Sequence, residues 1–267
     1  MNNILFAFSL TLFSGLCTGI GSAFAFFAKK TNTKFLSISL GFSAGVMIYV
    51  SMIEIFFKAK DALTSEFGLK IGSWLTVISF FSGMLIIALI DKVIPVGENP
   101  HDIYKVEDLS SNKVNSNNKL LRTGIFTAIA IAIHNFPEGL ATFISGLQAP
   151  SIAIPIAIAI AIHNIPEGIA VSVPVYYATG DKKKAFVYSF LSGLSEPLGA
   201  IIGYLILMPF INNTALGIIF GAVAGIMVFI SLDELLPSAR EYGEHHLSIY
   251  GLVGGMIVMA VSLLLFL

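Results

Sequence analysis

The sequence predicts an all-α integral membrane protein with eight transmembrane helices in a 3+2+3 inverted-repeat arrangement. Three observations carry this prediction: the composition, the number of long apolar runs and an internal repeat. Hydrophobic residues make up 56% of the 267 residues and charged residues only 12%, against about 25% charged in soluble domains. This balance indicates one membrane domain over residues 1–267, not a soluble domain with an anchor.

Eight apolar runs are each long enough to cross about 30 Å of hydrocarbon as a helix. They lie near residues 4–28, 35–57, 71–91, 122–146, 151–178, 185–209, 214–237 and 247–267. The first run lacks the basic start of a cleaved signal peptide, so we expect it to remain as a span. The single long connection, 95–121, is polar and ends in an Asn-rich segment, which predicts a mobile loop.

The distribution of positive charge predicts the orientation. Of the 15 Lys and Arg residues, all except Lys58, Lys60 and Lys70 lie in or beside connections that follow odd-numbered helices. Positively charged connections favour the cytoplasmic side of a membrane. We therefore expect a multi-pass protein of the cell membrane, with the 95–121 loop in the cytoplasm and both termini outside.

Two of the predicted helices repeat one another. GFSAGVMIYVSMIEIF (41–56) aligns with GAVAGIMVFISLDELL (221–236) at a constant offset. By the count of spans, the two helices cross the membrane in opposite directions. Their repeated small residues are expected to let neighbouring helices pack closely.

The repeat extends weakly to the flanking helices and divides the chain into three parts. Residues 1–94 and 185–267 form two three-helix repeats of inverted topology, and 122–178 holds the helix pair between them. Inverted repeats around a central polar site are typical of secondary transporters. The alignment also pairs Glu54 with Glu234, which lie near opposite membrane faces. Each would line the transport path on its own side of the membrane.

The central helix pair carries one polar hexapeptide twice. HNFPEG begins at residue 134 and HNIPEG at residue 163. Helical spacing places the His, Asn and Glu of each copy on one face: His134, Asn135 and Glu138 in the first copy, and His163, Asn164 and Glu167 in the second. These groups are ligands for divalent transition metals, and ionisable groups inside a membrane mark functional sites. The short link between the helices predicts that the two faces meet near mid-membrane.

A third carboxylate, Glu196, lies midway along the predicted 185–209 helix. Alone at the bilayer centre it would be strongly disfavoured or protonated, and beside Glu138 and Glu167 it would add repulsion unless cations are present. Three carboxylates, two imidazoles and two amides can balance two divalent ions. The sequence thus predicts a binuclear metal site with bridging glutamates.

Other interpretations compete with a transport site. Kinked helices with satisfied polar groups would explain one motif, but not two copies in the same register. An intramembrane zinc metalloenzyme needs an activated water and an open coordination position, yet neither copy has the His-Glu-x-x-His spacing. A metal-stabilised structural or receptor protein leaves the inverted repeat unexplained. We expect no enzymatic activity.

The paired motifs, Glu196, the eight spans and the cytoplasmic loop resemble the ZIP (Zrt/Irt-like) family over essentially the whole chain. The resemblance implies uptake of divalent metal into the cytoplasm, chiefly zinc, with iron and manganese as further substrates and no resident cofactor. It also implies the ligands of the two adjacent sites. These are His163, Glu138 and Glu167 for one metal, Asn135, Glu138, Asn164, Glu167 and Glu196 for the other, and His134 as a further candidate.

Two departures from the eukaryotic members matter. Many of those carry a HExPHE-type segment where this chain has HNIPEG, so metal selectivity does not transfer. Many also have a His-rich loop, whereas the 95–121 loop holds only His101. The expected partners are divalent metal ions and the lipid bilayer, and the net charge of −1 gives no reason for a nucleic-acid partner. Proton coupling and oligomeric state stay open, with a homodimer as one arrangement.

Overall fold

The computed structural model describes residues 3–25, 33–93, 115–148, 150–207, 212–242 and 245–265. These ranges are helical apart from short turns, so the predicted all-α fold is confirmed. The elements are α1 (Asn3–Ala25), α2 (Thr33–Val50), η1 (Ser51–Ile55), α3 (Phe56–Val93), α4 (Asn115–Gln148), α5 (Pro150–Thr179), α6 (Lys182–Gly193), α7 (Ser195–Leu207), α8 (Asn213–Ile230), η4 (Ser231–Leu235), α9 (Leu236–Tyr242) and α10 (His245–Leu265). The two short elements η1 and η4 are π-helical.

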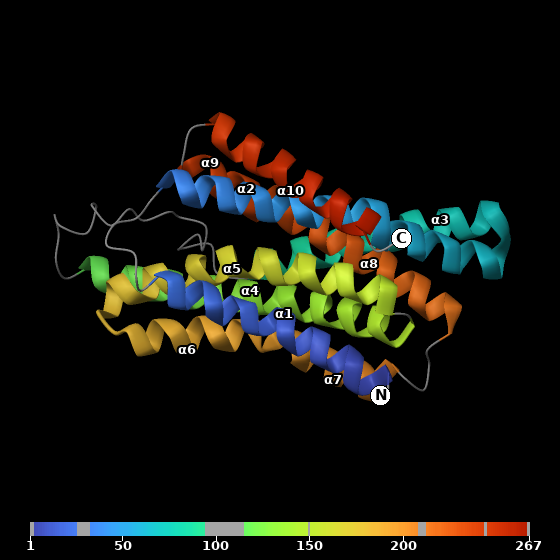
Figure 1. Ribbon diagram of the computed structural model, residues 1–267, viewed down its shortest axis with the longest axis horizontal. Helices are drawn as coiled ribbons and strands as arrows, with labels where there is room; N and C mark the ends of the chain where they lie inside the picture. Colours follow the sequence, from blue (N-terminus) through green and yellow to red (C-terminus); the bar gives the residue numbers. More distant parts are fainter. Residues whose placement is uncertain are drawn as a thin grey trace.

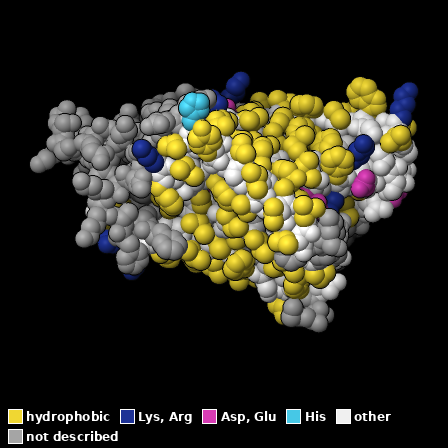
Figure 2. All heavy atoms as spheres, turned by 45° about the horizontal axis from the view of Figure 1, so that its top comes forward, with side chains coloured by type: hydrophobic (Ala, Val, Ile, Leu, Met, Phe, Trp, Pro, Cys, Tyr) yellow, Lys and Arg dark blue, Asp and Glu magenta, His cyan; other side chains and the backbone are white. Residues whose placement is uncertain are grey.

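Six helical stretches of the described chain are long and apolar enough to cross a membrane. They are Asn3–Ala23, Ser37–Ile90, Ala153–Ser172, Lys182–Ile206, Asn213–Arg240 and His246–Leu265. Large apolar side chains cover much of the outer surface, and Figure 2 shows this apolar face with charged groups mainly toward its ends. An apolar surface between charged ends is what a lipid-embedded protein requires.

The stretch Ser37–Ile90 reverses direction at Gly68, whose φ of 74° is a conformation that glycine adopts readily. Beyond this turn, Gly72 packs against the backbone of Leu63 and Thr64, so the two arms lie side by side. The first arm therefore runs well past the predicted end of its span at residue 57. The reason is that helical geometry continues without a break from α2 through η1 into α3.

The helix α4 begins at Asn115, earlier than the predicted start at residue 122. The end of the expected 95–121 loop is thus helical, because extending an established helix by a few residues costs little. The rest of that loop, up to residue 114, lies outside the described residues. The predicted 122–146 span forms part of α4, but α4 is not one of the six apolar stretches.

Glycines bring α2 against α10 and α8 against α3. A Cβ at Gly45 would lie 2.0 Å from the carbonyl oxygen of Leu252, and a Cβ at Gly225 would lie 1.9 Å from that of Phe80. The close packing predicted for these glycines is therefore confirmed. Gly45 and Gly225 match in the sequence repeat, so matching positions make matching contacts, α2 with α10 and α8 with α3.

In Figure 1, α4 and α5 lie in the middle of the bundle, with α1, α6 and α7 on one side and α2, α3 and α8 to α10 on the other. Along this central pair, α1 packs against α5, and α4 packs against both α5 and α7. The main apolar core includes Met47 and Met227 from the flanking repeats together with Ile144 and Ile160 from the central pair. Both hexapeptides are thus enclosed by helices from both sides.

Candidate metal centre

The two hexapeptides lie along α4 and α5, and both helices continue through the motif prolines as single elements. Six of the predicted ligands have completely buried side chains: Asn135, Glu138, His163, Asn164, Glu167 and Glu196, each with 0% exposure. The seventh, His134, is part of α4, but its side chain lies outside the described part of the structure. Burying so many polar groups is costly unless partners satisfy them, so their partners define the site.

His163 joins the two motif helices. Its Nε2 atom is 3.1 Å from Glu138 Oε2 on α4 and 4.0 Å from Glu167 Oε1 on the next turn of α5. The imidazole therefore lies between the carboxylates of both copies. One imidazole and carboxylates from facing helices are ligand types that zinc accepts.

Glu196 is fixed against the second motif by two donors. The Asn164 side-chain amide donates to Glu196 Oε1, and the Ser14 hydroxyl donates to Glu196 Oε2. The same amide also donates to the Ser14 carbonyl oxygen at 2.8 Å. Glu196 lies in the first turn of α7, where the helix N-terminus favours a negative charge. These contacts bring Glu196, from the predicted 185–209 helix, against the second motif.

Sequence reasoning did not assign Ser14 to the site. The signal that would have found it is the tripeptide Ser-Gly-Leu, which occurs at 14–16 and again at 192–194. The Asn135 amide donates to the Ser192 carbonyl oxygen at 3.5 Å, as Asn164 does to that of Ser14. Each motif amide therefore meets the backbone of one Ser-Gly-Leu segment.

The last residue of each motif is a glycine because a neighbouring backbone lies directly against it. A Cβ at Gly139 would lie 2.1 Å from the Glu196 carbonyl oxygen, and a Cβ at Gly168 would lie 1.9 Å from that of Thr18. Any side chain at either position would displace the neighbouring helix. Thr18 and Glu196 each follow the serine of a Ser-Gly-Leu segment by four residues, so both motif copies dock on equivalent backbone.

Several ligand-type atoms of the cluster lack a hydrogen-bond partner among the described residues. They are Asn135 Oδ1, Glu138 Oε1, His163 Nδ1 and Asn164 Oδ1. Each unsatisfied buried polar atom costs about 1–3 kcal/mol, and all four are oxygen or nitrogen donors suited to divalent cations. Within the described chain, no three His, Cys, Asp or Glu side chains come close enough to hold a metal by themselves. The observed contacts join His163 with Glu138 and Glu167, and Asn164 with Glu196. Asn135 contacts the backbone of Ser192 instead.

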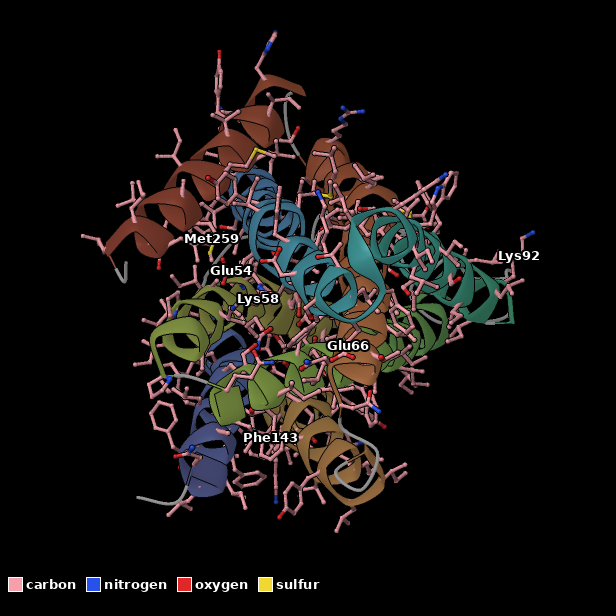
Figure 3. The ribbon with its side chains drawn as sticks, turned by 90° about the vertical axis from the view of Figure 1, so that its right-hand side faces the viewer. Glu54, Lys58, Glu66, Lys92, Phe143 and Met259 are labelled. Atoms are coloured by element: carbon pink, nitrogen blue, oxygen red, sulfur yellow. The ribbon has the colours of Figure 1, made fainter. Side chains whose placement is uncertain are left out.

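Glu54 lies apart from the hydrogen bonds of this cluster. It is in η1, where its Oε1 atom is 2.5 Å from Lys58 Nζ, and both side chains are partly exposed. Figure 3 shows the pair on the helix formed by α2, η1 and the start of α3. The matching Glu234 in η4 is also partly buried. The two π-helical segments therefore occupy equivalent positions in the two repeats.

Comparison with known proteins fits this geometry. Residues 98–263 match the family described as ZIP Zinc transporter. Three relatives named Zinc transporter ZupT align along nearly their whole lengths. The Clostridium perfringens protein is 67% identical, covering 100% of this chain and 98% of its own. The Streptococcus mutans protein is 69% identical with 97% of each chain covered, and that of Oceanobacillus iheyensis is 67% identical with 99% of each covered.

These relatives are named as transporters, so the metalloenzyme interpretation is not supported. The matched family region includes α4 and α5, with both hexapeptides and Glu196. The match extends over more than half of this chain, and the relatives extend it to both ends. The chain belongs to the ZIP zinc transporter family.

Proposed function

We propose that this protein carries zinc into the cytoplasm through a metal site between α4 and α5. One observation carries the proposal: six ligand-type side chains from both hexapeptides and α7 are completely buried in a chain of this family. The names of its relatives support zinc as the cargo. Iron and manganese are further substrates in this proposal, because amide and carboxylate oxygens suit harder ions.

The proposed site holds two metal ions side by side. His163 with Glu138 and Glu167 would hold the first, and the two glutamates would also serve the second. Oxygen ligands for the second ion come from Asn135, Asn164, Glu138, Glu167 and Glu196. The position of His163 between the carboxylates of both copies supports the first set. The Asn164–Glu196 contact supports the second.

The arrangement that we propose around this site has eight spans. Dividing Ser37–Ile90 at Gly68 and adding α4 to the six apolar stretches gives that number. The equivalent contacts of Gly45 and Gly225 support an inverted repeat. In such transporters one group of helices moves relative to another, so that a central site opens to each side in turn.

The proposed orientation places both termini outside the cell. Figure 1 shows both termini at one end of the bundle, and α2 and α6 begin at the other end. That other end carries Lys34 and the Lys182–Lys184 run at the starts of α2 and α6. Positive charge at the ends of spans favours the cytoplasmic side.

Zinc uptake into sealed vesicles that contain only this purified protein tests the function. We expect zinc to accumulate down its gradient without ATP, and a Glu138→Ala/Glu167→Ala double variant to match protein-free vesicles. A matched control is Glu66→Gln, which removes an exposed carboxylate that accepts from Asn213 at 2.9 Å and should leave uptake unchanged. Equal uptake by the double variant and the wild type would contradict the proposed site. Absence of uptake by correctly inserted wild-type protein would contradict transport.

A further inference from the structure

A cavity of about 380 Å³ lies at the turn between α5 and α6. It is lined by charged, hydroxyl and apolar side chains: Thr179, Asp181, Lys183, Lys184, Val187 and Tyr188. Along α5, Glu167 is 12 residues from Thr179, about 18 Å at the rise of an α-helix, so the cavity is separate from the metal centre. We propose that it binds the headgroup of an anionic phospholipid whose acyl chain lies along α6 and α7. This inference requires only that the chain spans a bilayer, and it does not rest on the metal cargo.

The turn is held by its own hydrogen bonds, which leave two ammonium groups for a ligand. Asp181 Oδ1 accepts from the backbone N–H groups of Lys183 at 2.8 Å and Lys184 at 3.2 Å. The Asp181 N–H donates to Thr179 Oγ1 at 3.1 Å. Asp181 thus caps the start of α6 through Oδ1, and its single negative charge offsets only part of the positive charge of the three lysines at this turn. Among the described ion pairs, none involves the Lys183 or Lys184 side chain.

The neighbouring lysine adds positive charge to the same turn while its side chain follows α5. The Nζ atom of Lys182 lies 5.9 Å from the centre of the Tyr176 ring. Three consecutive lysines at the end of a membrane span attract anionic lipid headgroups, and each contributes to the attraction. Tyr188, in the cavity wall, is a residue type enriched at this depth of a membrane.

An apolar stripe begins inside the cavity and continues along the outer face of the bundle. Val187 lines the cavity and is 41% exposed, and Leu191 and Leu198 follow at 56% and 50%. Val187 and Leu191 are four residues apart on α6, and Leu198 follows seven residues later on α7, after Leu194 with its helical backbone angles, so the three lie near one face. From residue 187 to residue 198 the rise is about 16 Å, close to half of the roughly 30 Å hydrocarbon thickness. Figure 1 shows α6 and α7 along the edge of the bundle, where lipid can reach this face.

The apolar stripe distinguishes a phospholipid from a free phosphate ion as the ligand of this cavity. A free phosphate ion would use the lysines alone, whereas a phospholipid would use the lysines and the stripe together. The shared Val187 joins the two parts into one surface, so the geometry favours a lipid. Lysines that act only as a signal for membrane orientation would show no preference for the headgroup.

Native mass spectrometry of the purified full-length protein in detergent tests this proposal. Dioleoyl phosphatidylglycerol and dioleoyl phosphatidylcholine are titrated separately, and glycerol phosphate is added as a soluble competitor. The variants are Lys183→Gln/Lys184→Gln for the charges and Leu191→Asn for the stripe. The matched control, Lys60→Gln/Lys70→Gln, removes the same charge from the other end of the bundle. Circular dichroism and gel filtration confirm that each variant remains folded.

We expect one phosphatidylglycerol to bind at least tenfold more tightly than phosphatidylcholine. The Lys183→Gln/Lys184→Gln variant should lose about tenfold or more of that affinity, and Leu191→Asn should lose several-fold. The Lys60→Gln/Lys70→Gln control should bind as the wild type does. An equal loss in the control would show unspecific charge attraction and would overturn the proposal. Full competition by glycerol phosphate, with no effect of Leu191→Asn, would overturn it in favour of a simple anion site.

Discussion

The two hexapeptides are nearly identical in sequence and differ in their surroundings. In the second copy, the Asn164 amide bonds both to the Ser14 carbonyl and to the Glu196 carboxylate. In the first copy, the Asn135 amide has one acceptor among the described residues, the Ser192 carbonyl oxygen, at the long distance of 3.5 Å. The flanking helices, and not the motifs themselves, therefore determine what each copy can do.

One pair of equivalent residues explains the difference. Thr18 and Glu196 occupy matching places on α1 and α7, and the backbone of each lies against a motif glycine. Their side chains differ. Glu196 carries a carboxylate, whereas Thr18 carries a hydroxyl that lacks a partner among the described residues. The repeat thus supplies a symmetric scaffold while the chemistry on it is asymmetric. This asymmetry supports one metal position with an imidazole ligand and a second built from oxygen ligands.

Removing either motif glutamate should produce the largest effect. In the proposed site Glu138 and Glu167 both contact both metals, so neither copy can compensate for the other. We expect Glu138→Ala and Glu167→Ala each to lower zinc uptake more than about 100-fold, since even outer-shell changes cost 10- to 100-fold at metal sites. Vesicle uptake, normalised to the amount of inserted protein, measures this. Uptake near the wild-type rate in either variant would remove that copy from the site.

The histidines should separate the two copies next. His163 lies 3.1 Å from Glu138, and it supplies the nitrogen ligand of the proposed first metal. We expect His163→Ala to lower zinc uptake about 10- to 100-fold, and His134→Ala to lower it less. Initial rates over a range of zinc concentrations test this order. A reversed order would assign the nitrogen ligand to the first copy.

Glu196 should change the choice of metal more than the rate for zinc. Its two hydrogen bonds place a carboxylate beside the second motif, where it adds to an oxygen-rich set suited to harder ions. For Glu196→Ala we expect a several-fold change in the ratio of zinc to iron or manganese uptake, with a smaller change in maximal zinc rate. Competition assays with mixed metals report the ratio. An unchanged ratio would count against two chemically different positions.

The smallest effect should appear in the stability of the two asparagine variants. Asn164→Ala removes two buried hydrogen bonds and leaves Glu196 with one donor fewer, so we expect a loss of about 1–3 kcal/mol. Asn135→Ala removes a single long contact and should cost under about 1 kcal/mol. Thermal unfolding in detergent without added metal compares them, and we expect the lower melting temperature for Asn164→Ala. Equal melting temperatures would mean that the two copies are held alike.

The contacts that depend on side-chain spacing along the two motif helices could be predicted from the sequence. The short link between the two motif helices predicted that their polar faces meet, and the structure has His163 beside Glu138. The contact of Asn164 with Ser14 could not be predicted in this way, because a backbone carbonyl has no residue type that marks it. Only the repeated Ser-Gly-Leu segment carried that information.

The same distinction holds for the fold. Apolar runs predicted the helices, and repeated glycines predicted the close contact at Gly45. The turn at Gly68 was harder to place, because the residues between the two predicted spans continue the helix instead of ending it. The π-helical segments η1 and η4 leave no pattern in side-chain polarity. Their positions, 180 residues apart, become meaningful only once the structure shows that both exist.

Zinc-edge anomalous scattering from crystals of the zinc-loaded protein tests the central claim most directly. We predict two peaks between α4 and α5, about 3.5–4 Å apart as in other two-metal sites, with Glu138 and Glu167 bound to both. His163 should contact one peak, and Asn164 and Glu196 the other. A single peak bound by one hexapeptide alone, or peaks away from both copies, would contradict the claim that the two motifs form one binuclear site.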